Sequence, residues 1–155
     1  MAQDAADLDR SAIAELVRTF FAAFTSGPDS GARLDALREI LLPEAVIVRT
    51  CGDPVAYDVE GFIAPRRQLL SGGALVDFRE RELSGSTLLF GDVAAHFCSY
   101  AKSGTLDGAP FTGRGMKSMQ FVRTRDGWRI SAVAWDDERD GVPWPADGSG
   151  HTRWA

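Results

Sequence analysis

Residues 93–137 decide the fold, and they read VAAHFCSYAKSGTLDGAPFTGRGMKSMQFVRTRDGWRISAVAWDD. Three runs in this stretch are rich in β-branched and aromatic residues, which is typical of strands. Asp107-Gly108 and Asp126-Gly127 separate them, and Asp-Gly between two extended runs is a strong hairpin signal. Strands joined in this way form an antiparallel meander. We expect them over residues 93–102, 111–124 and 128–137.

The strand pattern extends upstream of this stretch. Residues 75–83 and 87–90 are also extended in character, and Ser84-Gly85-Ser86 and Gly91-Asp92 are expected to end them. The second half of the chain is therefore predicted to consist of consecutive strands.

The first half of the chain shows helical spacing of apolar residues instead. One helix is predicted over residues 9–26 and ends at Gly27-Pro28. A shorter helix over residues 34–41 is expected to end before Pro43, which cannot continue it. A β-branched strand over residues 45–51 follows.

A third helix is predicted within residues 58–71; its start is open, and Pro65 is placed where it could be the first helical residue. Helices followed by a meander indicate a segregated α+β fold, because a parallel sheet needs alternating β-α-β units. The expected architecture is three helices in the N-terminal half, packed on a curved, mainly antiparallel sheet.

The predicted strands carry apolar residues on both faces. Val93, Ala95 and Phe97 alternate with Ala94 and Cys98, for example. Three helices can cover one face of the sheet only. We therefore expect the other face to pair with a second copy of the chain, which predicts a homodimer through the sheet.

Composition and charge narrow the class of protein. The 155 residues carry a net charge of -5, which disfavours nucleic acid and anionic membrane surfaces as partners. The start of the chain has no export signal and no segment is long enough to span a bilayer, so we predict a cytoplasmic location. Cys51 and Cys98 are then expected to be free thiols.

The predicted organisation is a flexible N-terminus over residues 1–8, one domain over 9–138 and a Pro/Gly-rich tail over 139–155. The tail has two interpretations. It is a partly ordered terminus, or Trp144 folds back over a pocket or onto a partner subunit.

Four segments and their order resemble the nuclear transport factor 2-like superfamily, including its SnoaL-like and ketosteroid isomerase-like branches. They are FFAAFTSG at 20–27, LLPEAVIVR at 41–49, EGFIAPRRQLL at 60–70 and DGWRISAVAWDDE at 126–138. The resemblance implies a cone-shaped α+β barrel, a pocket inside the cone and dimerisation through the sheet.

The resemblance to ketosteroid isomerase assigns possible roles to some residues. Asp53 resembles the position of the isomerase base, and Trp135 resembles a tryptophan of its pocket. The hydrogen-bond donors of the isomerase are missing, because Phe20 stands where the family has a tyrosine, and Ser118 or Met119 stands near its protonated aspartate. Loss of such donors removes several kcal/mol of transition-state stabilisation, which disfavours steroid isomerisation.

His96 and Tyr100 lie four residues apart on one predicted strand, so they share a face with Cys98 and form a candidate acid/base pair. This arrangement resembles the dehydratase branch of the superfamily. The alternative is that His96 lies on the dimer-facing side and hydrogen-bonds a neighbouring strand. Asp136, with the two acidic residues after it, is a candidate carboxylate at the pocket rim or a solvated strand end.

Two further questions remain open at the sequence level. Arg66 and Arg67 could meet a carboxylate at the pocket entrance or simply be solvated. On the strand over 111–124, either Met116, Ser118 and Gln120 or Lys117, Met119 and Phe121 could face inward, because a one-residue bulge reverses the choice.

These patterns predict a protein that binds an unknown apolar small molecule, with no cofactor and no metal. Any chemistry would be acid/base work such as isomerisation, dehydration or cyclisation. The alternative is a non-catalytic dimeric binding or assembly module. The expected pocket-lining residues are Phe20, Phe24, Val48, Phe62 and Trp135, with Asp53, His96 and Tyr100 as candidate catalytic groups.

Overall fold

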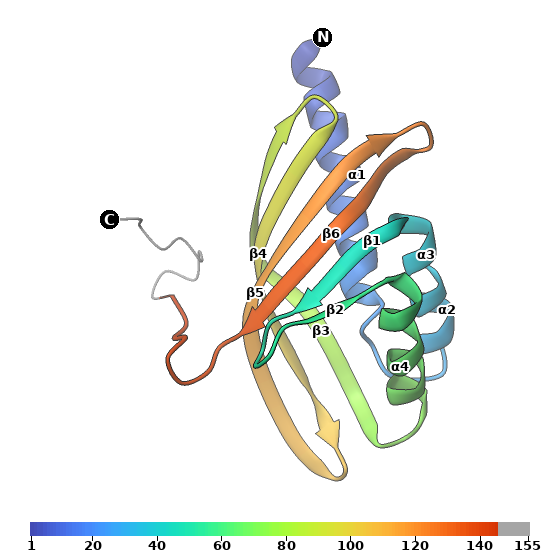
Figure 1. Ribbon diagram of the computed structural model, residues 1–155, viewed down its shortest axis with the longest axis vertical. Coiled ribbons are helices and arrows are strands. Elements are labelled where there is room, and N and C mark those ends of the chain that lie inside the picture. The colour runs from blue at the N-terminus through green and yellow to red at the C-terminus, as the bar shows by residue number, and fades with distance from the viewer. Residues whose placement is uncertain (146–155) are drawn as a thin grey trace.

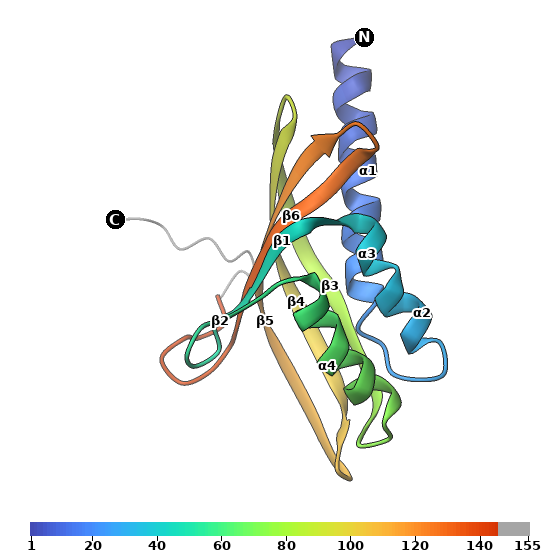
Figure 2. The same cartoon turned by 45° about the vertical axis from the view of Figure 1, so that its right-hand side comes forward.

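The computed structural model describes residues 1–145, in which four helices lie against one face of a curved sheet (Figures 1 and 2). The helices are α1 (Ala2–Ala22), α2 (Ser30–Asp35), α3 (Leu37–Ile40) and α4 (Val59–Ser71). The strands are β1 (Leu41–Arg49), β2 (Val55–Tyr57), β3 (Leu75–Phe90), β4 (Val93–Leu106), β5 (Ala109–Thr124) and β6 (Gly127–Asp137).

The sheet has the strand order β2-β1-β6-β5-β4-β3. Strands β3 to β6 form the predicted meander, and every pairing is antiparallel except that of β1 with β6. The expected α+β class with a mainly antiparallel sheet is therefore confirmed. Figure 2 shows how strongly the long strands twist across the helical layer.

The hairpin between β4 and β5 follows the predicted chemistry. Leu106 pairs with Ala109, so only Asp107 and Gly108 form the turn. Both have positive φ angles, 49° and 82°, as a two-residue turn matched to the strand twist requires.

Strand β3 differs from the expectation of two strands with a break at residues 84–86. It is continuous, and its pairing with β4 shifts register between Glu82 and Ser84. Leu83 is the extra residue of a β-bulge, and the small residues 84–86 pair with β4 instead of forming a turn. They do so because β4 continues alongside and supplies hydrogen-bond partners on both sides of the shift.

The helix boundaries also differ from those predicted. Helix α1 begins at Ala2, so residues expected to be flexible form its first turns. Alanines at positions 2, 5 and 6 have the highest helix propensity, and Asp4 is favourable in the first turn. The second predicted helix divides into α2 and α3, and Leu41 and Pro43 belong to β1.

Pro65 lies inside α4 rather than at its first position. The helix begins after Asp58, whose carboxylate accepts a hydrogen bond of 2.7 Å from the Gly61 backbone N–H. The helix therefore starts at this N-cap and not at Pro65, because the Asp58 carboxylate satisfies a backbone N–H that the first turn leaves without a partner.

Helix α1 packs its apolar face on the inner face of the sheet. Far from the centre of this contact, the Asp9 carboxylate accepts hydrogen bonds from Arg123 and from the Trp128 indole, at 2.7 and 3.0 Å. The hydrogen bonds from Arg123 and Trp128 lower the pKa of Asp9 to about 2.

The buried core includes Ile13, Val17, Phe20 and Phe21 of α1 and Tyr100, Met119, Phe121, Ile130 and Val133 of the sheet.

The outer face of the sheet carries no helix (Figure 1), and its part next to the turn between β3 and β4 is apolar. Val93, Ala95 and Phe97 point outward, whereas Ala94 and Cys98 point inward and are buried. Leu88, Phe90 and Val93 of this face are 74%, 85% and 54% exposed. No helix within residues 1–145 has the length and hydropathy that a membrane span requires.

Candidate functional site

A cavity of about 320 Å³ lies between helix α4 and the inner face of the sheet. It combines apolar walls with charged side chains. Its lining comprises Phe24, Arg49, Cys51, Phe62, Arg66, Leu69, Leu70, Leu75, Phe78, Glu80, Lys102, Leu106, Phe111, Lys117, Trp135 and Asp137.

Aromatic rings form one wall of the cavity. Phe62 of α4 lies edge-on to both Phe24 and Trp135, with ring centroids 5.8 and 6.0 Å apart. This geometry is the favourable one for aromatic pairs. The wall is therefore rigid and suited to a flat apolar group.

Lys117 is the most deeply buried charged residue of the cavity, at 3% exposure. Its ammonium group lies 3.3 Å from a carboxylate oxygen of Glu80. Five aromatic rings surround it, with centroids between 4.6 and 5.6 Å away: Phe20, Phe21, Phe24, Tyr100 and Trp135. Ring faces and one carboxylate thus replace most of the water around this charge.

Arg66 brings a second, half-buried cation to the cavity. Its guanidinium lies 3.8 Å from the centroid of the Phe62 ring and donates a hydrogen bond of 3.1 Å to the Phe62 carbonyl. Burial lowers the pKa of Arg66, which means that its charge has lost solvation. Within residues 1–145, neither Arg66 nor the neighbouring Arg49 forms an ion pair with a carboxylate.

A hydrogen-bonded group closes the sheet side of the cavity. The Tyr100 hydroxyl donates to the Asp137 carboxylate, which also accepts a hydrogen bond of 2.8 Å from Lys102. Burial raises the pKa of Asp137, but the hydrogen bonds from Lys102 and Tyr100 outweigh it and hold the pKa below its usual value. Burial and the adjacent Asp137 raise the pKa of Tyr100, so its hydroxyl stays protonated.

Gly115 makes this arrangement possible. A Cβ atom at this position would lie 2.5 Å from the Tyr100 hydroxyl oxygen and would also collide with the Asp136 carbonyl. Glycine at this position therefore leaves room for the Tyr100 hydroxyl group beside β5.

Three of the five expected pocket residues line the cavity, namely Phe24, Phe62 and Trp135. Phe20 is fully buried in the core instead, with its ring next to Phe24. Val48 pairs with Ala134 and so lies on the face of the sheet opposite to Trp135. Ala134 and Trp135 are consecutive residues of β6, and strand alternation directs their side chains to opposite faces of the sheet.

The candidate polar residues are separated by the structure. Asp53 lies in the exposed loop after β1 and does not line the cavity. Asp136 points away and binds Arg139, while Asp137, one residue later, lines the cavity. Of the candidate catalytic residues, Tyr100 alone takes part in the hydrogen-bonded group described above.

His96 does share the inner face with Tyr100 and Cys98, but it lies outside the cavity lining. Its Nδ1 is 2.7 Å from the Thr87 hydroxyl, and its Nε2 is 2.6 Å from a carboxylate oxygen of Glu82. It thus faces the helices rather than the outer, apolar side of the sheet. His96 and Tyr100 each have a different acidic partner.

Sequence reasoning left the roles of Lys117, Glu80 and Asp137 undetermined. One signal was available for Asp137, because a residue two positions after the predicted wall residue Trp135 must share its face. Lys117 belonged to one of two alternating sets, and the structure places its set, with Met119 and Phe121, inward. No sequence signal pairs Glu80 with Lys117, which lies 37 residues away.

The remaining predictions concern the arginines and the tail. Arg66 lines the cavity, while Arg67 binds Asp35 outside it. Trp144 lies over the guanidinium of Arg114, 4.5 Å from the ring centroid, and neither residue lines the cavity. The rest of the predicted tail, residues 146–155, lies outside the described residues.

Solved structures with the same arrangement of helices and sheet come from several bacteria. The Kfla4162 protein of Kribbella flavida is 20% identical and superposes with a TM-score of 0.71 over 86% of this chain and 93% of its own. A nuclear transport factor 2-like superfamily protein of Salmonella enterica serovar Typhimurium is 13% identical, with a TM-score of 0.72 over 95% of this chain and 99% of its own. This chain has the nuclear transport factor 2-like fold.

A third structure extends the comparison. The nuclear transport factor 2-like protein with a cystatin-like fold from Novosphingobium aromaticivorans is 20% identical, with a TM-score of 0.68 over 86% of this chain and 84% of its own. No protein-family model and no curated protein matches the sequence. The nuclear transport factor 2-like fold hosts unrelated functions, so function must be argued from the residues of the cavity.

Proposed function

We propose that this nuclear transport factor 2-like protein binds a small organic anion with an apolar, ring-containing body in the cavity under α4. The observation that carries the proposal is the balance of charge. Four cationic side chains line the cavity, Arg49, Arg66, Lys102 and Lys117, against the two carboxylates of Glu80 and Asp137. The two carboxylates pair with Lys102 and Lys117, so the surplus positive charge at the cavity belongs to Arg66 and Arg49. A partly desolvated surplus of positive charge favours a ligand that brings negative charge.

The walls and size of the cavity support the same class of ligand. Its volume of about 320 Å³ lies at the lower end of the usual range for small-molecule sites. The wall of Phe24, Phe62 and Trp135 offers ring faces and edges to a flat group. Arg66 lies beside that wall and can bind a carboxylate with two parallel hydrogen bonds.

Binding is better supported than acid/base catalysis. A general base works best with a pKa near the working pH, and Asp137 is held in its ionised form below its usual pKa. Asp53 and His96 do not line the cavity, and Phe20 has no hydroxyl to donate to a developing oxyanion. A place in the SnoaL-like or ketosteroid isomerase-like branch, and a cytoplasmic location, stay predictions.

Replacing Arg66 by Met tests the proposed anion site. The probe pair is phenylacetate and its neutral analogue 2-phenylethanol, measured by calorimetric titration. We expect Arg66→Met to weaken phenylacetate binding by about tenfold or more, since a hydrogen bond to a charged group contributes about 1.5–3 kcal/mol. Binding of 2-phenylethanol should change little.

The matched control for this experiment is Arg67→Met. It removes the same charge from the next residue of α4, where Arg67 binds Asp35 rather than lining the cavity. Equal losses of phenylacetate binding in both variants would contradict the proposal. So would a wild-type protein that binds phenylacetate no better than 2-phenylethanol.

We also propose that two copies pair through the outer face of the sheet. The exposed Leu88, Phe90 and Val93 lie together on strands β3 and β4, which form a hairpin. An apolar surface of this kind on a soluble protein marks an interaction site. A second copy is the simplest partner, because a face can pair with itself about a two-fold axis.

Substitutions on this face test the dimer by light scattering. We expect Val93→Asp and Ala95→Asp to give monomers, because each would bury a carboxylate without a partner at the interface. Leu8→Asp on α1 is the control, since Leu8 is 72% exposed but lies away from the outer face. Dimers in both sheet variants would rule out this interface.

A further inference from the structure

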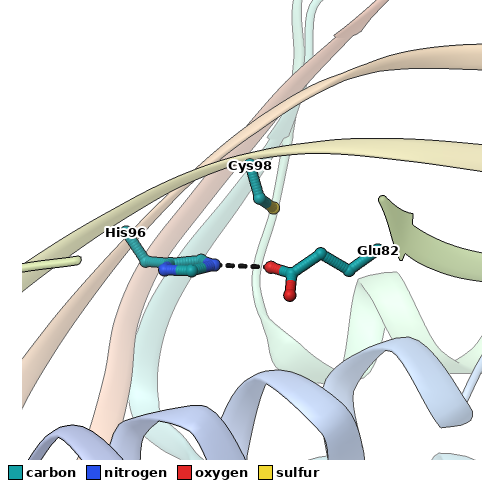
Figure 3. A group of neighbouring side chains, drawn as sticks. All are labelled: Glu82, His96 and Cys98. Atoms are coloured by element: carbon teal, nitrogen blue, oxygen red, sulfur yellow. Dashed lines mark hydrogen bonds and ion pairs between the residues drawn. The ribbon is translucent and has the colours of Figure 1, made fainter. Parts of the chain in front are cut away.

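A second group of polar side chains lies outside the cavity, on the same inner face of the sheet. Glu82 comes from β3, and His96 and Cys98 come from β4. Figure 3 shows the three side chains converging above the ribbon of a helix, with the His96 ring directed at the Glu82 carboxylate. One potential ligand atom from each residue lies within 4.8 Å of the other two.

We propose that Glu82, His96 and Cys98 bind a divalent transition-metal ion of the zinc class. Imidazole nitrogen, thiolate sulfur and carboxylate oxygen are all zinc ligands, with bonds of about 2.0–2.3 Å. Tetrahedral bonds of that length place the ligand atoms about 3.3–3.8 Å apart. The three ligand atoms lie within 4.8 Å of one another, so side-chain adjustments of about an ångström would give this geometry.

The surroundings of His96 support a metal-binding orientation. Its Nδ1 is 2.7 Å from the Thr87 hydroxyl, which can accept the Nδ1–H hydrogen bond and leave Nε2 as the ligand atom. Nε2 lies 2.6 Å from a Glu82 carboxylate oxygen, a hydrogen bond that one shared proton would make. The metal would take the place of that proton and of the Cys98 thiol proton, and both would pass to solvent.

Local backbone features give the group its shape. The absence of a side chain at Gly85 leaves room for the imidazole, since a Cβ atom there would lie 2.6 Å from His96 Cε1. The bulge between Glu82 and Ser84 turns Glu82 to the same face as Thr87, five residues away. Without the bulge, strand alternation would send these two side chains to opposite faces.

The site would hold the ion with three protein ligands and keep one position for water. His96 and Cys98 are buried, whereas the Glu82 side chain is 34% exposed, so ions and water can enter past Glu82. The long Glu82 side chain can also move back by the small distance that the ion needs. Three ligands with an open position are typical of zinc sites that keep a bound water.

Cobalt titration of the chelator-treated, untagged protein tests the proposal. Co²⁺ bound to a thiolate gives an absorption band from charge transfer that neither free Co²⁺ nor a site of oxygen ligands gives. We expect one equivalent of Co²⁺ to produce this band in the wild type and Zn²⁺ to abolish it. Cys98→Ser should lose the band, and Glu82→Gln should weaken Co²⁺ binding by about tenfold or more.

The matched control is Cys51→Ser, which removes the other thiol and should keep the band, because Cys51 lines the cavity and not this site. Glu82→Gln also serves as an independent test, because it alters a partly exposed residue and should fold even if a Cys98 variant does not. The proposal is overturned if the wild type shows no band, if Cys98→Ser keeps it, or if Cys51→Ser loses it. Unchanged Co²⁺ affinity in Glu82→Gln would likewise overturn the three-ligand site.

Discussion

Phe20→Ala should lower the free energy of unfolding by about 3–5 kcal/mol, the range for truncating a buried phenylalanine. Phe20 is fully buried and lies edge-on to Phe21 and Phe24, so its removal leaves a cavity that its neighbours cannot fill. Its ring also lies 5.0 Å from the Lys117 ammonium. The measurement is urea unfolding followed by circular dichroism.

Leu8→Ala is the control for the Phe20 experiment. Leu8 belongs to the same helix but is 72% exposed, so its truncation should change the free energy of unfolding by no more than about 0.5 kcal/mol. An unchanged urea midpoint for Phe20→Ala would show that Phe20 borders a space open to water. Phe20 would then be a pocket residue, as the sequence first suggested.

Glu80→Leu should also cost about 3–5 kcal/mol, because it leaves the buried ammonium of Lys117 without its carboxylate. Within residues 1–145, Glu80 is the residue that forms an ion pair with Lys117, and the two side chains are only 11% and 3% exposed. The double variant Glu80→Leu/Lys117→Met should regain most of the lost stability, since it removes both charges. Urea unfolding of the wild type, the two single variants Glu80→Leu and Lys117→Met, and the double variant gives the coupling energy between the two side chains.

A surface pair provides the comparison for this cycle. Glu15 and Arg18 are about two thirds exposed, at 68% and 66%, so Glu15→Leu should change stability by about 0.5 kcal/mol or less. If Glu80→Leu is as mild as Glu15→Leu, water in the cavity already solvates Lys117. The aromatic rings around the ammonium would then matter more than its carboxylate partner.

Most of the fold could be predicted because its signals are local. The turn at Asp107-Gly108 needs residues that tolerate positive φ, and the sequence shows them at that point. Predictions failed where a neighbouring element decided the outcome. Residues 84–86 were expected to form a turn, but pairing with β4 made them part of a bulged strand.

The candidate site was less predictable, because strand alternation groups residues without saying which group faces inward. Trp135 and Asp137 share a face, and the choice of Asp136 as the rim residue missed this relation. The charged residues of the cavity come from β1, α4 and each of the four meander strands. Periodicity within one strand carries no information about such partners.

The sequence by itself determined the order of helices and strands, the meander and its hairpins, since these depend on neighbouring residues along the chain. Only the tertiary structure decided which faces are buried and which distant charges meet. The bulge in β3 brings Glu82 to His96, and β4, which pairs with both β3 and β5, brings Lys117 of β5 within reach of Glu80 of β3. Both results arise from contacts between strands, where a shift of one residue exchanges the two faces.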